Sequence, residues 1–292
     1  MKEGRGGGPN GLVLVSKPAG PTSHDVVDVV RRVLGVQRVG HLGTLDPFAK
    51  GLLVVVVGRA TRLASFAAGW TKAYEGVIRL GITTDTDDAT GVSVATAPWT
   101  GISLTQLASV IGGFRGAYEQ RPPAYSAVKI DGERAYKRAR RGEAVAPAAR
   151  RVEIHELELV EAAVPDLQFR ATVSGGTYLR SLARDIGAAL GCGAHLAALR
   201  RTAVGALQLA DAVAPEAVTT AAVRDPAILV AHLPRYELTG DERTAVVHGR
   251  PIKREPVADA RQPVALFAGR VLLAVAEQVG EFLKPRVVVA ES

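Results

Sequence analysis

The sequence contains a single cysteine, Cys192, in 292 residues, which excludes an intrachain disulfide and any metal cluster held only by cysteines. It also lacks a long apolar run. The longest purely aliphatic stretch is Leu52–Val57, whereas a helix that crosses a bilayer needs roughly 20 apolar residues. The glycine-rich residues 1–10 have no apolar segment of the kind that signal peptides carry. We therefore expect a soluble, cytoplasmic protein without membrane association.

Common ligand-binding patterns are missing as well. No Walker A or Rossmann glycine motif lies between a strand and a helix, and no G-x-S-x-G elbow is present. The histidines show no pair at the spacing of a helical zinc site. Asp85–Asp88 fails the calcium-loop template because Thr90 and Thr96 occupy the glycine and glutamate positions, so it is interpreted as a solvated turn. The sequence thus predicts neither a metal nor a cofactor.

Basic residues exceed acidic ones, with 36 Lys plus Arg against 29 Asp plus Glu, and only 8 of the basic residues are lysines. Such an excess favours polyanionic partners, and arginine suits phosphates and bases, although a GC-rich genome explains the arginine bias equally well. Five basic residues fall within eight positions around Tyr136: Arg134, Lys137, Arg138, Arg140 and Arg141. This cluster indicates either nucleic-acid binding or a solvated helix face.

Apolar periodicity predicts alternating strands and helices up to about residue 235, followed by short strands. Ser23 is the expected N-cap of a first helix that ends at Gly35, and Ser103 with Gln106 forms a capping box for a second. The remaining expectations are strands at 12–16, 52–57, 72–80, 167–173, 264–267, 271–275 and 286–289, a loop at 35–51, a helix after Gly176, and alanine-rich helix over 211–235.

The loop His41–Pro47 is the densest candidate site, since Gly40 and Gly43 permit unusual backbone angles and Pro47 favours an extended Asp46. The loop is either catalytic, through His41 and Asp46, or an ordinary turn. Tyr178 and Arg180 open the helix after Gly176, where Tyr178 either faces a cleft or serves the core. Arg200 and Arg201 either bind phosphate or are solvated. These residues alone define a basic α/β protein with a candidate acid site.

Five blocks, in order, carry a resemblance to a known family: Gly11–Pro18; Gly40–Pro47 with Gly51–Leu53; Lys72–Tyr74 with Thr84–Asp87; Pro122–Lys129; and Gly176–Arg180 with Gly191–His195 and Leu199–Arg201. In these blocks the chain resembles the TruB family of tRNA pseudouridine synthases. The resemblance covers residues 11–205. It implies an α+β fold with a mixed, mostly antiparallel sheet, flanking helices and a small β-rich PUA-like C-terminal domain.

The resemblance also implies a domain division and an activity. Residues 1–10 are expected to be a disordered tail, 11–234 the catalytic domain and 235–292 a PUA-like RNA-binding domain. The implied reaction isomerises uridine 55 in the tRNA T-loop to pseudouridine, with the target base flipped out and without a cofactor or metal. The chain has the bacterial layout, with an insert at 120–150 that stand-alone enzymes use against the tRNA arm. We expect a monomer that requires no protein partner.

By the same resemblance, Asp46 matches the catalytic carboxylate and Arg180 the residue that pairs with it. Tyr74 matches the active-site tyrosine that stacks on the flipped base, and it is a candidate catalytic base in the sugar-proton step. The other matched positions are pocket residues Tyr178 and Leu199, His41, which fills space vacated in the T-loop, and phosphate contacts from Lys17 and the run Arg134, Lys137, Arg138, Arg140 and Arg141.

Two alternatives to this tRNA enzyme are considered. The first alternative is a non-catalytic RNA-binding or tRNA-folding module on the same scaffold. The second is a synthase that acts on another RNA that imitates the T-arm. Asp46 argues for the enzyme because a pure RNA binder gains nothing from a carboxylate facing phosphates.

Overall fold

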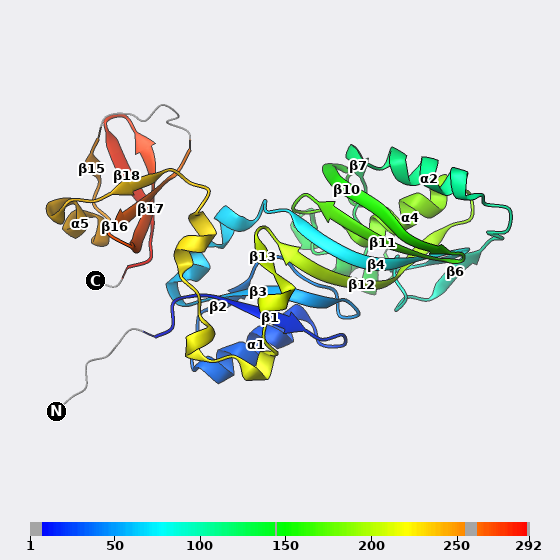
Figure 1. Cartoon of the computed structure of the whole chain (residues 1–292), viewed down its shortest axis with the longest axis horizontal. Helices are drawn as coiled ribbons and strands as arrows, with labels where there is room; N and C mark the ends of the chain where they lie inside the picture. Colours follow the sequence, from blue (N-terminus) through cyan, green and yellow to red (C-terminus); the bar gives the residue numbers. More distant parts are fainter. Residues whose placement is uncertain (1–7, 144, 255–261, 291–292) are drawn as a thin grey trace.

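The computed structural model describes residues 8–143, 145–254 and 262–290. An elongated body carries a smaller lobe at one end (Figure 1). The strands of the body are β1 (Gly11–Lys17), β2 (Val39–His41), β3 (Lys50–Val57), β4 (Lys72–Leu80), β5 (Ile82–Thr84), β6 (Ser93–Thr96), β7 (Gly116–Gln120), β8 (Lys129–Ile130), β9 (Glu133–Arg134), β10 (Arg150–Ala163), β11 (Asp166–Val173), β12 (Ala194–Val204) and β13 (Leu207–Gln208). Its helices are α1 (Ser23–Leu34), α2 (Leu104–Gly113), α3 (Ala135–Arg140) and α4 (Leu179–Ala189).

One long sheet organises the body, in the order β1-β3-β12-β4-β11-β10-β7, with β2 and β13 at its side. Its neighbours pair antiparallel except for a short parallel contact between β3 and β12, at Lys50–Arg200 and Gly51–Arg201. The expected mixed, mostly antiparallel sheet with flanking helices is therefore confirmed. The parallel contact matters because it brings the loop before β3 beside the end of β12.

The first half of the sheet is apolar on both faces because both faces are covered. One face of β1 and β3 packs on α1 through Val13, Val26, Val30 and Val55. The other face packs on 3-10 helices, which include η1 (Gly58–Ala67) and η5 (Pro226–Val230). This double coverage explains the unbroken aliphatic run of β3, and it fixes the position of β3, the strand that follows the candidate loop.

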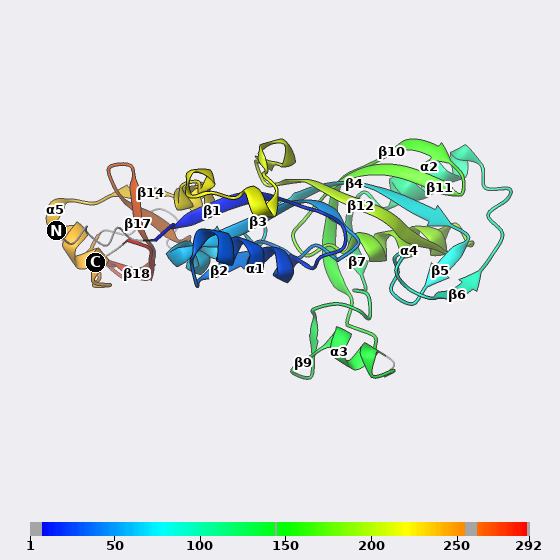
Figure 2. The ribbon, with the colours of Figure 1, turned by 90° about the horizontal axis from the view of Figure 1, so that it is seen from below.

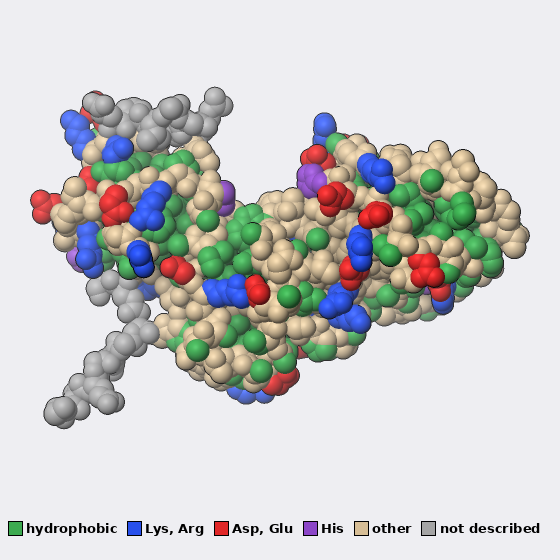
Figure 3. Space-filling view, in the orientation of Figure 1, with side chains coloured by type: hydrophobic (Ala, Val, Ile, Leu, Met, Phe, Trp, Pro, Cys, Tyr) green, Lys and Arg blue, Asp and Glu red, His purple; other side chains and the backbone are tan. Residues whose placement is uncertain are grey.

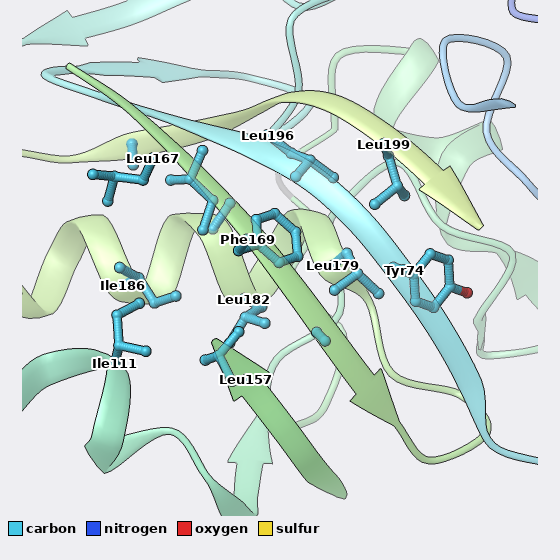
Figure 4. Packing of buried hydrophobic residues seen from close by; sticks show 14 of the residues in the cluster. Tyr74, Ile111, Leu157, Leu167, Phe169, Leu179, Leu182, Ile186, Leu196 and Leu199 are labelled. Atoms are coloured by element: carbon cyan, nitrogen blue, oxygen red, sulfur yellow. The ribbon is translucent and has the colours of Figure 1, made fainter. Parts of the chain in front are cut away.

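The second half of the sheet has α4 and α2 on one face (Figure 1). Tyr74, Ile78 and Leu80 alternate on β4 and are buried there, as their spacing predicts. They join Phe169 of β11 and the predicted α4 stripe in one core cluster. Figure 4 shows Tyr74 at the margin of this cluster, beside Leu179 and Leu199, with its hydroxyl pointing away from the packed side chains.

Several local predictions were wrong. Thr22, not Ser23, caps α1: its side chain accepts from the Asp25 amide, and Asp25 accepts from the Thr22 amide. The expected loop at 35–51 contains strand β2. The region 211–235 is not an alanine-rich helix but a chain of short 3-10 turns, η2 (Leu209–Asp211), η3 (Pro215–Ala217), η4 (Thr220–Ala222) and η5. This segment follows β1 instead, with backbone hydrogen bonds from Leu12 to Arg224 and from Ser16 to Val213.

The end lobe contains β14 (Arg235–Glu237), β15 (Ile252–Lys253), β16 (Val264–Ala268), β17 (Val271–Val279), β18 (Phe282–Val288) and helix α5 (Gly240–Val247). Its sheet has the order β14-β16-β17-β18-β15, which is consistent with the small β-rich domain expected from the sequence. The lobe packs directly against the body. Phe267, Leu272 and Val275 of the lobe belong to the same apolar cluster as Leu63 and Leu229 of the body.

Both ends of the described chain meet at this junction. Of the expected tail at 1–10, residues 1–7 lie outside the described part, whereas Asn10 is held in place. Its side chain donates to the Val289 carbonyl at 3.3 Å and accepts from the Ala60 amide at 2.8 Å. None of the helices described in residues 8–290 is long and apolar enough to span a membrane.

Candidate active site

The loop that connects β2 to β3 carries Asp46 and is held from three sides. The Ser23 hydroxyl donates to the Leu45 carbonyl at 2.9 Å and accepts from the Leu45 amide at 2.8 Å. Lys17 Nζ donates to the carbonyls of Pro18, Pro47 and Ala49, at 3.0, 3.2 and 2.7 Å. Since β1 and α1 supply these clamps, the position of Asp46 is fixed by the most deeply buried part of the fold.

Asp46 is engaged by Arg180, as the sequence predicts. Arg180 Nη2 donates to Asp46 Oδ1 at 3.0 Å, and Nε lies 2.9 Å from Oδ2. The same guanidinium donates to the carbonyls of Thr86 and Tyr125, at 2.9 and 3.0 Å. The Arg180 side chain is 6% exposed and that of Asp46 is 32% exposed. The carboxylate therefore faces the pocket while its partner is fixed behind it.

The protonation of Asp46 is set by opposing effects. Burial raises the pKa of this carboxyl, and the nearby charge of Asp88 raises it further, whereas Arg180 and Lys17 oppose the rise. The carboxylate thus has a pKa above that of an ordinary aspartate, with two cations that favour its ionised form.

Asp87 and Asp88 pair with two arginines of α4 and surround the site, which the interpretation of Asp85–Asp88 as a solvated turn does not predict. Asp88 is 4% exposed, and its Oδ2 lies 3.6 Å from Arg180 Nη1. Its Oδ1 accepts from the Thr90 amide and hydroxyl at 2.9 and 2.6 Å. Asp87 forms an ion pair with Arg184 at 2.9 Å. The turn therefore holds the Arg180 side chain in place through Asp88 and the Thr86 carbonyl. No periodicity in the sequence of the turn predicts that it is buried.

The pocket in front of Asp46 has a volume of about 360 Å³ and is lined by Tyr74, Tyr178, Leu199 and Arg180, which the sequence had singled out. Tyr178 is fixed by Gln120, whose side chain accepts from the Tyr178 amide at 2.8 Å and donates to its carbonyl at 3.1 Å. The Arg150 guanidinium lies over the Tyr178 ring, 4.7 Å from its centroid. Aromatic and apolar side chains thus share the walls with the cations Lys72, Arg150, Arg180 and Arg201, around the half-buried carboxylate of Asp46.

Lys17 does not occupy the position expected of a phosphate contact. It is 1% exposed, and its ammonium is directed into the loop carbonyls described above. Burial lowers its pKa to about 8, against the opposing charge of Asp46. The prediction of a phosphate contact is therefore corrected: Lys17 supports the loop. The block Gly11–Pro18 carries no spacing that distinguishes a buried lysine from an exposed one.

His41 lies in β2 at the start of the loop and is half-buried. Burial and the charge of Arg201 lower its pKa, which favours the neutral imidazole. It does not line the pocket of Asp46. Arg201 is neither solvated nor on the surface: it is 0% exposed and donates to the carbonyls of Leu52 and Gly43 at 2.7 and 3.0 Å. It is a third clamp on the loop, while Arg200 is exposed near Glu75.

The basic run around Tyr136 forms α3 on a hairpin that projects from the body (Figure 2). Its five cations are not equivalent. Arg138 pairs with Glu143, and Arg141 with Glu133 and Glu143, at 2.7–2.8 Å. Arg134, Lys137 and Arg140 are exposed and have no acidic partner among the described residues. On the face drawn in Figure 3, basic side chains are similarly interspersed with acidic ones.

The arrangement suits chemistry on a planar ring attached to a sugar. Aromatic and aliphatic walls offer stacking, and one carboxylate supplies a nucleophile or a charge that stabilises a developing cation. No cluster of three or more acidic, histidine or cysteine side chains with metal-binding geometry occurs within residues 8–143, 145–254 and 262–290. A nucleoside-sized group, held beside Asp46, is the ligand that this pocket fits.

Comparison with known proteins matches the chain to two family models in succession. Residues 31–179 match the TruB family pseudouridylate synthase N-terminal domain, and residues 180–233 match the tRNA pseudouridylate synthase B C-terminal domain. Among curated relatives, the tRNA pseudouridine synthase B of Azoarcus sp. is 43% identical over 96% of this chain and 95% of its own length. That of Thermobifida fusca is 45% identical over 97% and 99%.

Solved structures show the same fold. One, titled an H/ACA RNP bound to a substrate RNA containing 2′-deoxyuridine, matches with a TM-score of 0.73 at 23% identity, covering 97% of this chain and 86% of the other. A Cbf5–Nop10–Gar1 complex matches with a TM-score of 0.71 at 26% identity, covering 97% and 84%. The fold is that of the pseudouridine synthases. Within that class, the chain belongs to the TruB family of pseudouridylate synthases.

Proposed function

We propose that this enzyme isomerises uridine 55 in the T-loop of tRNA to pseudouridine, with Asp46 as its catalytic carboxylate. The observation that carries the proposal is the pairing of Asp46 with Arg180 at the base of a pocket whose walls are Tyr74, Tyr178 and Leu199. The family to which the chain belongs and the names of its relatives support the reaction and a tRNA substrate.

The target uridine must leave the folded T-loop to enter the pocket. Flipping costs a few kcal/mol, which stacking on aromatic side chains offsets. Tyr74 is proposed to stack on the base, with Leu199 and Tyr178 as further walls of the pocket. Two hydrogen bonds from Gln120 to the Tyr178 backbone support this wall. His41, outside the pocket, is proposed to fill the space that the base vacates.

In the reaction, the N1–C1′ bond of uridine breaks, the uracil turns, and a C5–C1′ bond forms. C5 loses its proton, N1 gains one, and no oxidation or reduction takes place, so the atoms balance without a co-reactant. Asp46 acts at the sugar, either by attack on C1′ or by stabilising and deprotonating a sugar intermediate. In either role it must be ionised, and the guanidinium of Arg180 favours that form. Tyr74, which lines the same pocket, is proposed to serve as a base in the sugar-proton step.

The RNA arm is proposed to lie along the α3 hairpin, which projects from the body (Figure 2) and carries the exposed cations Arg134, Lys137 and Arg140. Residues 235–292 are proposed as a second RNA-binding domain, distinct from the catalytic domain at 11–234. We propose that the enzyme acts in the cytoplasm as a monomer without a protein partner.

The test is tritium release from unmodified tRNA that carries C5-tritiated uridine, with the wild type beside Asp46→Asn. Only a uridine whose C5 becomes the glycosidic carbon loses its tritium. We expect one equivalent from the wild type and none from the variant, with tRNA binding retained by both. Binding without release by the wild type would leave an RNA-binding module, whereas release by both proteins would remove Asp46 from the chemistry.

A further inference from the structure

Two buried cations that the reaction does not use line the same pocket. Lys72 lies on β4, two residues before Tyr74, and is 8% exposed. Arg201 lies directly across from Tyr74 on β12 and is 0% exposed. Lys72 Nζ has one polar contact, to the Trp70 carbonyl at 3.0 Å. Arg201 Nη1 is buried without a hydrogen-bond partner among the described residues.

Both cations converge on Gly43, which is exposed in the pocket wall. A Cβ built on Gly43 would lie 3.1 Å from Lys72 Cε, 4.0 Å from Lys72 Nζ and 3.7 Å from Arg201 Nη1. Gly43 has a φ of +85°, a backbone conformation that disfavours any side chain. The missing side chain therefore lets the loop backbone pack closely against both charged groups, which lie together in one part of the pocket wall.

The charges of Lys72 and Arg201 are not neutralised by the protein. Neither forms an ion pair with an acidic side chain in the described part of the chain, in contrast to Arg180, which has Asp46 and Asp88. Burial and the charge of Arg201 lower the pKa of Lys72 to about 8. Buried cations without a counter-charge are costly, so two of them in the wall of one pocket favour an anionic ligand.

We propose that Lys72 and Arg201 form a phosphate subsite that binds one of the two phosphodiesters flanking the flipped uridine. The inference rests on the proposed function for its ligand, since a nucleotide that enters this pocket brings its own phosphates with it. A phosphate supplies the negative charge and the several acceptor oxygens that an ammonium and an unpartnered guanidinium nitrogen require. The subsite positions the nucleotide, while Asp46 acts on the sugar.

The proposal is tested with a T-arm stem-loop RNA in which the 5′ or the 3′ phosphate of the target uridine is replaced by an uncharged methylphosphonate. At one of the two linkages, the wild type should bind the modified RNA about tenfold more weakly, because a charge-assisted contact is lost. Lys72→Met should bind the RNA modified at that linkage and the unmodified RNA with equal affinity. Lys72→Arg, which keeps the charge, should still bind the modified RNA more weakly than the unmodified RNA. Equal weakening in wild type and Lys72→Met, or none in the wild type, would overturn the subsite.

Lys50→Met is the matched control, since Lys50 is an exposed lysine on β3, in the same sheet, and lies outside this pocket. It should discriminate between the two RNAs as the wild type does. Thermal unfolding of every variant checks that the fold is intact.

A second arm uses inorganic phosphate alone, so that it is independent of the RNA and of the tritium assay. Phosphate should raise the midpoint of thermal unfolding of the wild type and of Lys50→Met, and should raise it less for Lys72→Met. Equal shifts in all three proteins would refute the subsite even if pseudouridine is formed. A selective shift in an enzyme that releases no tritium would instead preserve the subsite and refute the proposed reaction.

Discussion

Asp46 and Asp88 share one guanidinium: Arg180 lies 2.9 Å from the first carboxylate and 3.6 Å from the second. Asp46 opens onto the pocket, whereas Asp88 is buried and further anchored by Thr90. Asp88 therefore has two opposite effects on the Asp46 carboxylate. It holds Arg180 in place, and through its own negative charge it raises the pKa of Asp46, in addition to the larger effect of burial.

Asp88→Asn should move the acid limb of the pH–rate profile to lower pH. The substitution keeps an oxygen to accept from Thr90 but removes the negative charge, so the pKa of Asp46 falls and its ionised form persists to lower pH. The measurement is the single-turnover rate of pseudouridine formation against pH. Asp87→Asn, which disturbs Arg184 instead, should leave the acid limb in place. An unchanged or upward-shifted limb in Asp88→Asn would contradict this account.

Ser23→Ala should slow the reaction with little change in RNA affinity. The hydroxyl makes two buried hydrogen bonds to Leu45, next to Asp46, and their loss frees the loop at its centre. We expect a loss of about 1–3 kcal/mol in unfolding free energy and a fall of about tenfold or more in the single-turnover rate. Ser103→Ala, which removes the N-cap of α2, should cost about 1 kcal/mol and leave the rate unchanged. Similar rates in both variants would show that the Ser23 clamp does not position Asp46.

Lys72→Met should stabilise the RNA-free enzyme at neutral pH, by about 1–3 kcal/mol, because it removes a buried charge that has no acidic partner among the described residues. The gain should shrink with rising pH. Lys72 has a pKa of about 8 when folded and 10.5 when unfolded, so between these values the unfolded chain binds the extra proton and wild-type stability rises. Urea unfolding at pH 7 and 9.5 measures both effects. A variant less stable than wild type at pH 7 would show that the charge is already compensated.

The two kinds of cation on α3 should differ in their effect on RNA binding. Arg134→Ala, Lys137→Ala and Arg140→Ala should each weaken binding and lower the salt dependence of affinity by about one released counterion. Arg141→Ala should do so less, because its guanidinium is already paired with Glu133 and Glu143. Binding titrations over a range of salt concentrations measure the slopes. Equal slopes for Arg140→Ala and Arg141→Ala would refute the distinction.

The fold was predictable from the sequence wherever one local pattern decided the outcome. The alternation of Tyr74, Ile78 and Leu80 correctly gave the buried face of β4, and the α4 stripe was likewise correct. The pattern failed at 211–235, where alanine content suggested a helix. That segment contains Pro215 and Pro226, and its backbone hydrogen-bonds to β1, so tertiary pairing outweighed helix propensity.

The site was predictable only in part. Family motifs led to Asp46, Arg180, Tyr74, Tyr178 and Leu199, and the structure brings these five together. The supporting residues were misjudged, because charge alone suggests solvent. Lys17, Asp88 and Arg201 are all nearly inaccessible, and each has at least one polar contact to a residue distant in sequence. No local pattern reveals which charged residue the fold will bury.

The apolar cluster that joins the end lobe to the body has a geometric consequence. Phe267 and Leu272 on one side and Leu63 and Leu229 on the other form one continuous core, and Asn10 and Arg59 add hydrogen bonds across the same boundary. The lobe consequently has a fixed distance and direction from the Asp46 pocket. An RNA that contacts both at once must match that separation and angle in its own folded shape, so rejection of wrongly shaped RNAs needs no reading of their bases.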